Sequence, residues 1–279
     1  MIPARFEYEV AESPEHAIEL LGSSEDAKLL AGGHSLIPAM RLRLARPSLV
    51  VDIGRLNELS YVRDASEHIA IGALTRHKDV RDAPLLQEHC PIVSHTAGLI
   101  GDPQVRHRGT IGGSLSHGDP ASDLPTVMLV LGADLQIRGP DGERVVSAPE
   151  FFTGVFQTAL APAELLVEVR VPKLSSATGW SYLKMSRRAQ DWATVAVAAL
   201  VERKNGSVES AAIALTNMGA TPLRASSAEA ALAGGSSVAE AASHIAEGTE
   251  PPSDQAGSSD FRKHLAEVLG RRSLEEALA

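Results

Sequence analysis

Two glycine pairs stand beside small hydroxyl side chains and ahead of apolar runs. The first lies in LLAGGHSLIPAMRLRL (residues 29–44) and the second in RGTIGGSLSHGDPASDLP (residues 108–125). Glycine loses much backbone entropy on folding, so a pair is favoured where the chain takes positive φ or where a ligand approaches the backbone. Free amides at the start of a helix form an anion site, most often for phosphate. The pattern therefore predicts either one extended diphosphate held by two loops or two tight turns at subdomain corners.

The standard nucleotide fingerprints are absent. No glycine lies two positions after another, which excludes G-x-G-x-x-G, and there is no G-K-[ST]. Ser35 and Ser114 lack the G-x-S-x-G elbow of a hydrolase nucleophile. The sequence thus indicates neither a Rossmann site, nor a P-loop, nor a hydrolase.

Histidines and one acid near the glycine pairs were considered as ligands. The histidines follow no H-E-x-x-H or paired-ligand spacing, so surface or capping roles are favoured over a metal site for His34, His77, His107 and His117. Asp123 precedes a helix-like run. Its carboxylate could cap that helix or accept from a ribose hydroxyl, and the local sequence favours the cap.

Composition narrows the class of protein. The 279 residues are 44% hydrophobic and 22% charged, as in soluble globular proteins, and the net charge of −9 argues against a nucleic-acid binder. No readable secretory signal and no apolar run of membrane-spanning length are present, so we expect a cytoplasmic protein without a membrane span. Cys90 is the only cysteine, which excludes an internal disulfide and a four-cysteine iron–sulfur cluster within this sequence.

Helix and strand patterns alternate irregularly up to about residue 170. Ser13, Pro14 and Gly22 are start and stop signals for a helix. Residues 49–53 and 68–73 are expected to be strands, and residues 133–148 a hairpin. Three strand-like runs follow at 180–186, 193–203 and 209–219, with Asn205-Gly206 as a hairpin turn between the last two. Helical periodicity in 238–248 and 262–279 completes a small antiparallel sheet backed by helices, which makes the chain α+β.

Three segments together resemble the FAD-binding medium subunit of molybdenum hydroxylases, the carbon monoxide dehydrogenase and xanthine dehydrogenase family. They are AGGHSLIPAMRLRL, QVRHRGTIGGSLSHGDPASDLP and YLKMSRRAQDWATVAVAA, and the likeness extends over the whole chain. The resemblance implies a PCMH-type FAD-binding domain over residues 1–173, with α+β subdomains at about 1–57 and 58–173. It implies a C-terminal domain over residues 174–279, made of a three-stranded antiparallel sheet with helices.

The resemblance also implies the residues that bind FAD. The first diphosphate loop corresponds to Ala31, Gly32, Gly33, His34 and Ser35, and the second to Thr110, Ile111, Gly112, Gly113 and Ser114. Asp123 matches the family acid near the ribose, and Lys184 lies in the K-x-x-R-R run of the flavin-proximal strand. Trp192 falls where related subunits carry a tyrosine over the isoalloxazine ring, with a core tryptophan as the alternative.

In that family, substrate is oxidised at the molybdenum cofactor of a large subunit. Electrons then pass through two [2Fe-2S] clusters of a small subunit to non-covalent FAD and on to an external acceptor. The resemblance thus implies an oxidoreductase flavoprotein subunit of a heterotrimer, expected as a dimer of heterotrimers, with no catalytic acid, base, nucleophile or metal of its own. The substrate (carbon monoxide, an N-heterocycle or an aldehyde) and the acceptor (a quinone, NAD or oxygen) stay open.

Two alternatives remain at this point. One is a free-standing flavin oxidase or reductase of the same FAD fold, with a covalent flavin on His34. The other is a nucleotide-binding module without turnover.

Overall fold

A parallel three-stranded sheet opens the chain. The computed structural model describes residues 1–205 and 207–279. The strands pair in the order β1-β3-β2 and are β1 (Glu7–Val10), β2 (Lys28–Leu30) and β3 (Leu49–Asp52). The expected first helix is confirmed as α1 (Pro14–Gly22), where the Ser13 side chain accepts from the backbone N–H of His16 and so caps the helix. Between β2 and β3 lies the short helix α2 (Leu36–Arg41).

A five-stranded antiparallel sheet forms the centre of the molecule. The 3-10 turn η1 (Asn57–Leu59) precedes its first strand in the chain. The strands lie side by side in the order β4-β5-β10-β6-β7. Their bounds are β4 (Val62–Asp64), β5 (His68–Gly72), β10 (Leu165–Pro172), β6 (Asp134–Gly139) and β7 (Gly142–Ser147). Strands β6 and β7 are the expected hairpin.

Six helices lie between β5 and β6 in the chain and a seventh follows β7. They are α3 (His77–Asp82), α4 (Pro84–His89), α5 (Pro91–Gly98), α6 (Pro103–Arg108), α7 (Ile111–His117), α8 (Asp123–Leu131) and α9 (Ala148–Phe151). Of these, α4, α7, α8 and α9 contact strands of the central sheet, and the others pack mainly on neighbouring helices. A small hairpin, β8 (Phe152–Gly154) with β9 (Gln157–Thr158), leads back to β10. Every residue of α8 is buried, so this helix lies in the middle of the apolar core.

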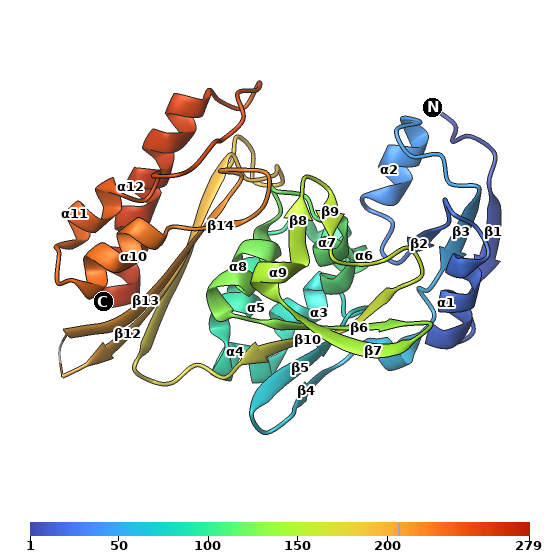
Figure 1. Ribbon diagram of the computed structural model, residues 1–279, viewed down its shortest axis with the longest axis horizontal. Helices are drawn as coiled ribbons and strands as arrows, with labels where there is room; N and C mark the ends of the chain where they lie inside the picture. The colour runs from blue at the N-terminus through green and yellow to red at the C-terminus, as the bar shows by residue number, and fades with distance from the viewer. Residues whose placement is uncertain (206) are drawn as a thin grey trace.

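The last sheet is antiparallel, as expected. Its long strands are β11 (Thr178–Met185), β12 (Val195–Lys204) and β13 (Ser207–Thr216), and the two-residue β14 (Leu223–Arg224) extends the expected three strands at the edge. The helices on its outer side are α10 (Ser226–Ala233), α11 (Val238–Ser243) and α12 (Ser259–Leu278) (Figure 1). Gly206, half of the expected Asn205-Gly206 turn, lies outside the described residues. None of the described helices combines the length and apolar character of a membrane span.

Strand β12 is buried on both faces, which explains its unbroken apolar run. Side chains alternate between the faces of a strand, so odd and even positions meet different neighbours. One set packs in the cluster of α10–α12, namely Val195, Val197, Ala199 and Val201. The other set joins the cluster that contains α8, namely Ala196, Ala198 and Leu200.

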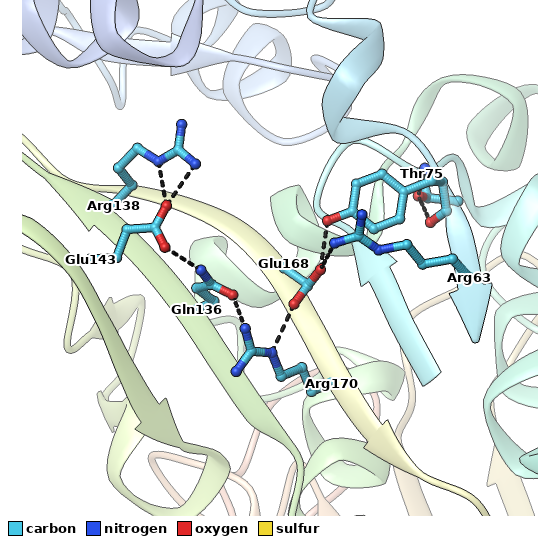
Figure 2. A network of polar contacts seen from close by, with 8 residues as sticks. Arg63, Thr75, Gln136, Arg138, Glu143, Glu168 and Arg170 are labelled. Carbon is cyan, nitrogen blue, oxygen red and sulfur yellow. Dashed lines mark hydrogen bonds and ion pairs between the residues drawn. The ribbon is translucent and has the colours of Figure 1, made fainter. Parts of the chain in front are cut away.

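A polar network crosses the central sheet (Figure 2), and an ion pair between Arg138 and Glu15 extends it to α1. The buried Glu168 carboxylate accepts from Tyr61 Oη at 2.7 Å, Arg63 Nη2 at 2.9 Å and Arg170 Nε at 2.7 Å. Burial opposes ionisation of Glu168, but these three donors outweigh it and lower its pKa. The network continues through Gln136, Glu143 and Arg138 to Glu15 on α1.

Candidate functional site

The two glycine loops lie against each other. The first loop (residues 31–35) joins β2 to α2, and the segment called the second loop (residues 108–114) runs from the end of α6 into the first turn of α7. A Cβ added to Gly32 would come within 2.8 Å of the Gly109 Cα and closer still to the Arg108 carbonyl oxygen. Only glycine therefore allows this backbone contact, which brings the two loops together.

The first loop has open backbone donors. Within the described residues, no hydrogen bond uses the N–H groups of residues 32–35, and Ser35 makes no side-chain cap for α2. Gly33 takes φ +79°, and a left-handed residue of this kind turns neighbouring amides toward a common side. The loop therefore carries a row of N–H groups without a protein acceptor, which suits an anion.

The second loop has no such row, so the expectation that both loops offer free amides is wrong for this one. The Ile111 N–H donates to Thr75 O at 3.0 Å and the Gly112 N–H to Ala73 O at 2.8 Å. Thr110 satisfies the next two amides, with its Oγ1 accepting from Gly113 and its carbonyl from Ser114, each at 3.0 Å. The start of α7 is thus joined to residues 73–75 and capped by its own threonine.

The two glycines of the second loop differ in their surroundings, because Gly112 is closely packed and Gly113 is exposed. A Cβ on Gly112 would lie 2.5 Å from Ala73 Cβ and 2.7 Å from Ala73 O, so this position serves close packing. Gly113 is exposed, and a Cβ there would meet only Thr110 Oγ1, at 2.8 Å. What the second loop can offer a ligand is this open face together with the half-buried Ser114 hydroxyl, because Thr110 is buried and its hydroxyl caps α7.

Asp123 is held by protein partners on both carboxylate oxygens. Oδ1 accepts from Tyr182 Oη at 2.7 Å and Oδ2 from Lys184 Nζ at 2.9 Å, with both charged side chains almost fully buried. Burial raises the pKa of Asp123, and the Lys184 ammonium and the Tyr182 hydroxyl oppose that shift. The expected capping role is wrong, because Ser122 takes the N-cap position of α8 and Asp123 is its first helical residue.

Tyr182 was not anticipated as part of this cluster. It lies on β11 two residues before Lys184, and alternation in a strand places both side chains on the face that meets α8. The period-2 pattern around Lys184 is the sequence signal that points to Tyr182.

Trp192 is exposed, which excludes the core alternative. It lies in the connection from β11 to β12, and 55% of its surface is accessible. The base of this connection is fixed at Thr194, whose N–H donates to Met185 O at 2.8 Å and whose carbonyl accepts from the buried Arg262. The indole is therefore a free aromatic surface on a well-anchored loop.

The four histidines occupy unrelated environments. His77 is buried, and burial, followed by the nearby Arg106, His34 and Arg76 charges, lowers its pKa to about 4. His34 and His107 are exposed, and His117 packs on Phe156 with ring centroids 5.0 Å apart. Across residues 1–205 and 207–279, no three histidine, cysteine or acidic side chains gather as a metal site would require.

Comparison with known proteins accounts for this arrangement. Residues 4–174 match the model of the FAD binding domain in molybdopterin dehydrogenase, and residues 180–277 that of the CO dehydrogenase flavoprotein C-terminal domain. The carbon monoxide dehydrogenase medium chain of Hydrogenophaga pseudoflava is 40% identical, with 100% of this chain and 99% of the relative covered. The glyceraldehyde dehydrogenase medium chain of Sulfolobus acidocaldarius is 37% identical, with 99% of each covered.

A solved structure agrees over the full length. Quinoline 2-oxidoreductase from Pseudomonas putida 86 contains a chain that superposes with a TM-score of 0.94 at 33% identity, covering 100% of this chain and 98% of that one. The matched family models and the shared fold confirm the resemblance drawn from the glycine segments. The chain therefore belongs to the family of FAD-binding medium subunits of molybdenum hydroxylases.

Proposed function

We propose that this chain is the electron-transfer subunit of a molybdenum hydroxylase complex. Electrons from the [2Fe-2S] clusters of a partner subunit would pass to its FAD and from there to an external acceptor. FAD, when bound, supplies the redox chemistry, and the chain supplies binding, orientation and shielding. The observation that carries the proposal is the row of open amides in the first loop, directly against the second loop.

The residues present fit a dinucleotide. The amides of Gly32, Gly33, His34 and Ser35 would hold the diphosphate, with Ala31 as an apolar flank. On the other side, Ser114 would offer a hydroxyl group and Gly113 an open face. The buried residues Thr110, Ile111 and Gly112 would support this face, Thr110 as the cap of α7 and Gly112 by close packing on Ala73. All of these contacts are non-covalent.

The other expected residues would act at the far parts of the cofactor. A ribose hydroxyl would use a remaining lone pair of the Asp123 carboxylate. Lys184 donates to that carboxylate, opposing the rise of its pKa on burial, and ties β11 to α8. Trp192 would place its exposed indole over the isoalloxazine ring.

The partners follow from what this chain lacks. Cys90 is buried, and burial raises the pKa of its thiol to about 12, so it does not supply a thiolate for a cluster. We propose a small iron–sulfur subunit and a large molybdenum subunit as partners, in a cytoplasmic dimer of heterotrimers. Relatives with similar medium chains are named for carbon monoxide, glyceraldehyde and quinoline, so we assign substrate choice to the large subunit.

Reduction of the isolated chain tests the proposal. Loaded with FAD, it should be bleached by dithionite but not by the substrate of the complex. Adding both partner subunits should make substrate bleach the flavin, and omitting the iron–sulfur subunit should abolish this again. Bleaching by substrate in the isolated chain would favour a free-standing flavoenzyme. After acid precipitation the flavin should stay in the supernatant, whereas a yellow pellet would indicate a covalent link at His34.

A further inference from the structure

One asparagine is hydrogen-bonded both to the loop that carries Trp192 and to the FAD-binding domain. Asn217 directly follows β13 and takes the left-handed conformation, with φ +63°. Its backbone N–H donates to Pro120 O at 2.9 Å, in the connection between α7 and α8. Its side-chain Nδ2 donates to Ala193 O at 2.8 Å and to Thr194 O at 3.3 Å. Asn217 therefore joins two segments that are far apart in the sequence.

The backbone conformation makes the asparagine informative. A left-handed residue is most easily glycine, which has no Cβ to clash, and asparagine is among the few other residues that adopt this conformation. Asn217 is half-buried and uses its side-chain amide, which glycine would lack. The position thus combines a conformation that favours glycine with a side chain that glycine does not replace. Asn205, after β12, is also left-handed but exposed.

The strand end that carries Asn217 is fixed on the buried helix α8. The preceding residue, Thr216, donates through Oγ1 to Thr126 Oγ1 at 2.7 Å, and both side chains are fully buried. Helix α8 begins at Asp123, the acid expected near the ribose. The side chain of Asn217 therefore takes its place from the same helix that positions this acid.

A buried arginine holds the same backbone from another element. Arg262 on α12 has no exposed surface and donates through Nη1 to Thr194 O and through Nη2 to Asp254 Oδ1. The Thr194 N–H donates to Met185 O at the end of β11. The two residues that follow Trp192 are thus held by groups from β11, α12 and the end of β13.

We propose that Asn217 is a positioning residue for Trp192. It fixes the carbonyl groups of residues 193 and 194 relative to the FAD-binding domain, and so sets where the exposed indole stands. This inference rests on the proposed function, in which the indole lies over the isoalloxazine ring. Aromatic stacking depends on ring separation and offset, so a loosened loop should lose the stacking. FAD itself should stay bound, because the open amides lie in the first glycine loop.

Tryptophan fluorescence tests the positioning without the cofactor. The chain has two tryptophans, so Trp180→Phe leaves Trp192 as the only one. In this background, Asn217→Gly keeps the left-handed conformation and removes both side-chain donors. It should raise the amplitude of fast fluorescence depolarisation by about twofold or more. Asn205→Gly is the matched control and should leave it unchanged. Equal depolarisation in Asn217→Gly and its parent would refute the assignment.

Flavin emission tests the positioning with FAD bound. An indole stacked on a flavin quenches its fluorescence, so Trp192→Phe should raise the emission of bound FAD by about threefold or more. Asn217→Gly should raise it part of the way, but not further when Trp192→Phe is already present, since no indole is then left to move. A further rise in that background would mean that Asn217 acts on the whole FAD site rather than on Trp192.

The parent variant separates this inference from the proposed function. Unchanged emission in Trp192→Phe would remove Trp192 from the flavin and overturn the positioning role of Asn217. The reduction experiment with dithionite and the partner subunits would still decide whether the chain is an electron-transfer subunit.

Aspartate at position 217 separates positioning from folding. It has nearly the same shape and tolerates the left-handed conformation, but its carboxylate does not donate to the two carbonyl oxygens and would be repelled by them. Asn217→Asp should therefore raise flavin emission at least as much as Asn217→Gly, with wild-type flavin content. The melting temperature of Asn217→Gly should fall by only about 2–4 °C. Wild-type emission in Asn217→Asp would show that the two hydrogen bonds do not hold the loop.

Discussion

In the first glycine loop the amides of residues 32–35 have no protein partner, whereas those of residues 111–114 are all satisfied by Ala73, Thr75 and Thr110. The polar groups of α8 are likewise satisfied by protein partners, since both oxygens of Asp123 accept, one from Tyr182 and one from Lys184. The difference lies in what is next to each loop, since the second runs beside residues 73–75, whose carbonyl groups accept from Ile111 and Gly112. Like-looking glycine pairs can therefore have opposite roles, one for a ligand and one for packing.

The largest effect is expected on the closed side, at Asp123. Asp123→Ala should destabilise the chain by about 3–5 kcal/mol, because it leaves the Lys184 ammonium buried without a partner. Adding Lys184→Met should restore most of that loss in chemical denaturation. FAD affinity of the double variant then reports on the ribose contact alone, and wild-type affinity would remove Asp123 from the binding site.

On the open side, Gly33→Asp should weaken FAD by about a hundredfold, roughly 2.7 kcal/mol, since it places negative charge among the free amides. Gly33→Asn is the matched control, because asparagine tolerates the left-handed conformation without the charge. It should lose about tenfold or less in a flavin titration. Equal affinities of the two variants would mean that no anion lies at this loop.

Gly112→Ala should act through packing. The added methyl would meet Ala73 at 2.5 Å, so we expect a loss of about 1–3 kcal/mol in the free energy of unfolding. FAD affinity of the folded fraction should stay within about twofold of the wild type. An unchanged melting temperature combined with lost flavin would reverse the assignment of the second loop to packing.

The smallest effect at neutral pH concerns His77, whose backbone N–H donates to Gly109 O at the start of the second loop. Its pKa is lowered from 6.5 to about 4, so below pH 6.5 the unfolded chain binds a proton that the folded chain does not. As the pH is lowered from 6.5 to 4, the contribution of His77 to the free energy of unfolding should therefore fall by about 1.4 kcal/mol per pH unit. His77→Gln should flatten this part of the stability curve, and an identical slope would show that His77 is already charged in the folded protein.

Local signals in the sequence were sufficient for most of the architecture. The helix from Pro14 to Gly22 follows from its cap and stop residues, and the last sheet follows from alternation and long apolar runs. The contact of the two loops at Gly32 could be expected only through the family resemblance. Which amides stay open could not be predicted, because it depends on Ala73 and Thr75, which lie nearly forty residues before Ile111 and Gly112, whose N–H groups donate to their carbonyl oxygens.

The two alternatives that fail, a helix cap at Asp123 and a core position at Trp192, have the same origin. The local sequence favoured a cap at Asp123, a preference that the family resemblance reversed; Ser122 takes the cap position and two strand residues engage the carboxylate. Trp192 could be assigned to a core only by its residue type, because its exposure depends on how the connection from β11 to β12 is anchored. Neither outcome is encoded in neighbouring residues.

The burial of β12 on both faces limits how this subunit can be divided by evolution or by the experimenter. Because Ala196, Ala198 and Leu200 share a core with α8, a fragment beginning at residue 174 would expose them to water and invite aggregation. The two halves are matched by separate family models, but they share one hydrophobic core, so no boundary between them can be cut without exposing buried residues. Gene fusions that append new modules to this subunit should therefore respect its whole length and add at its ends.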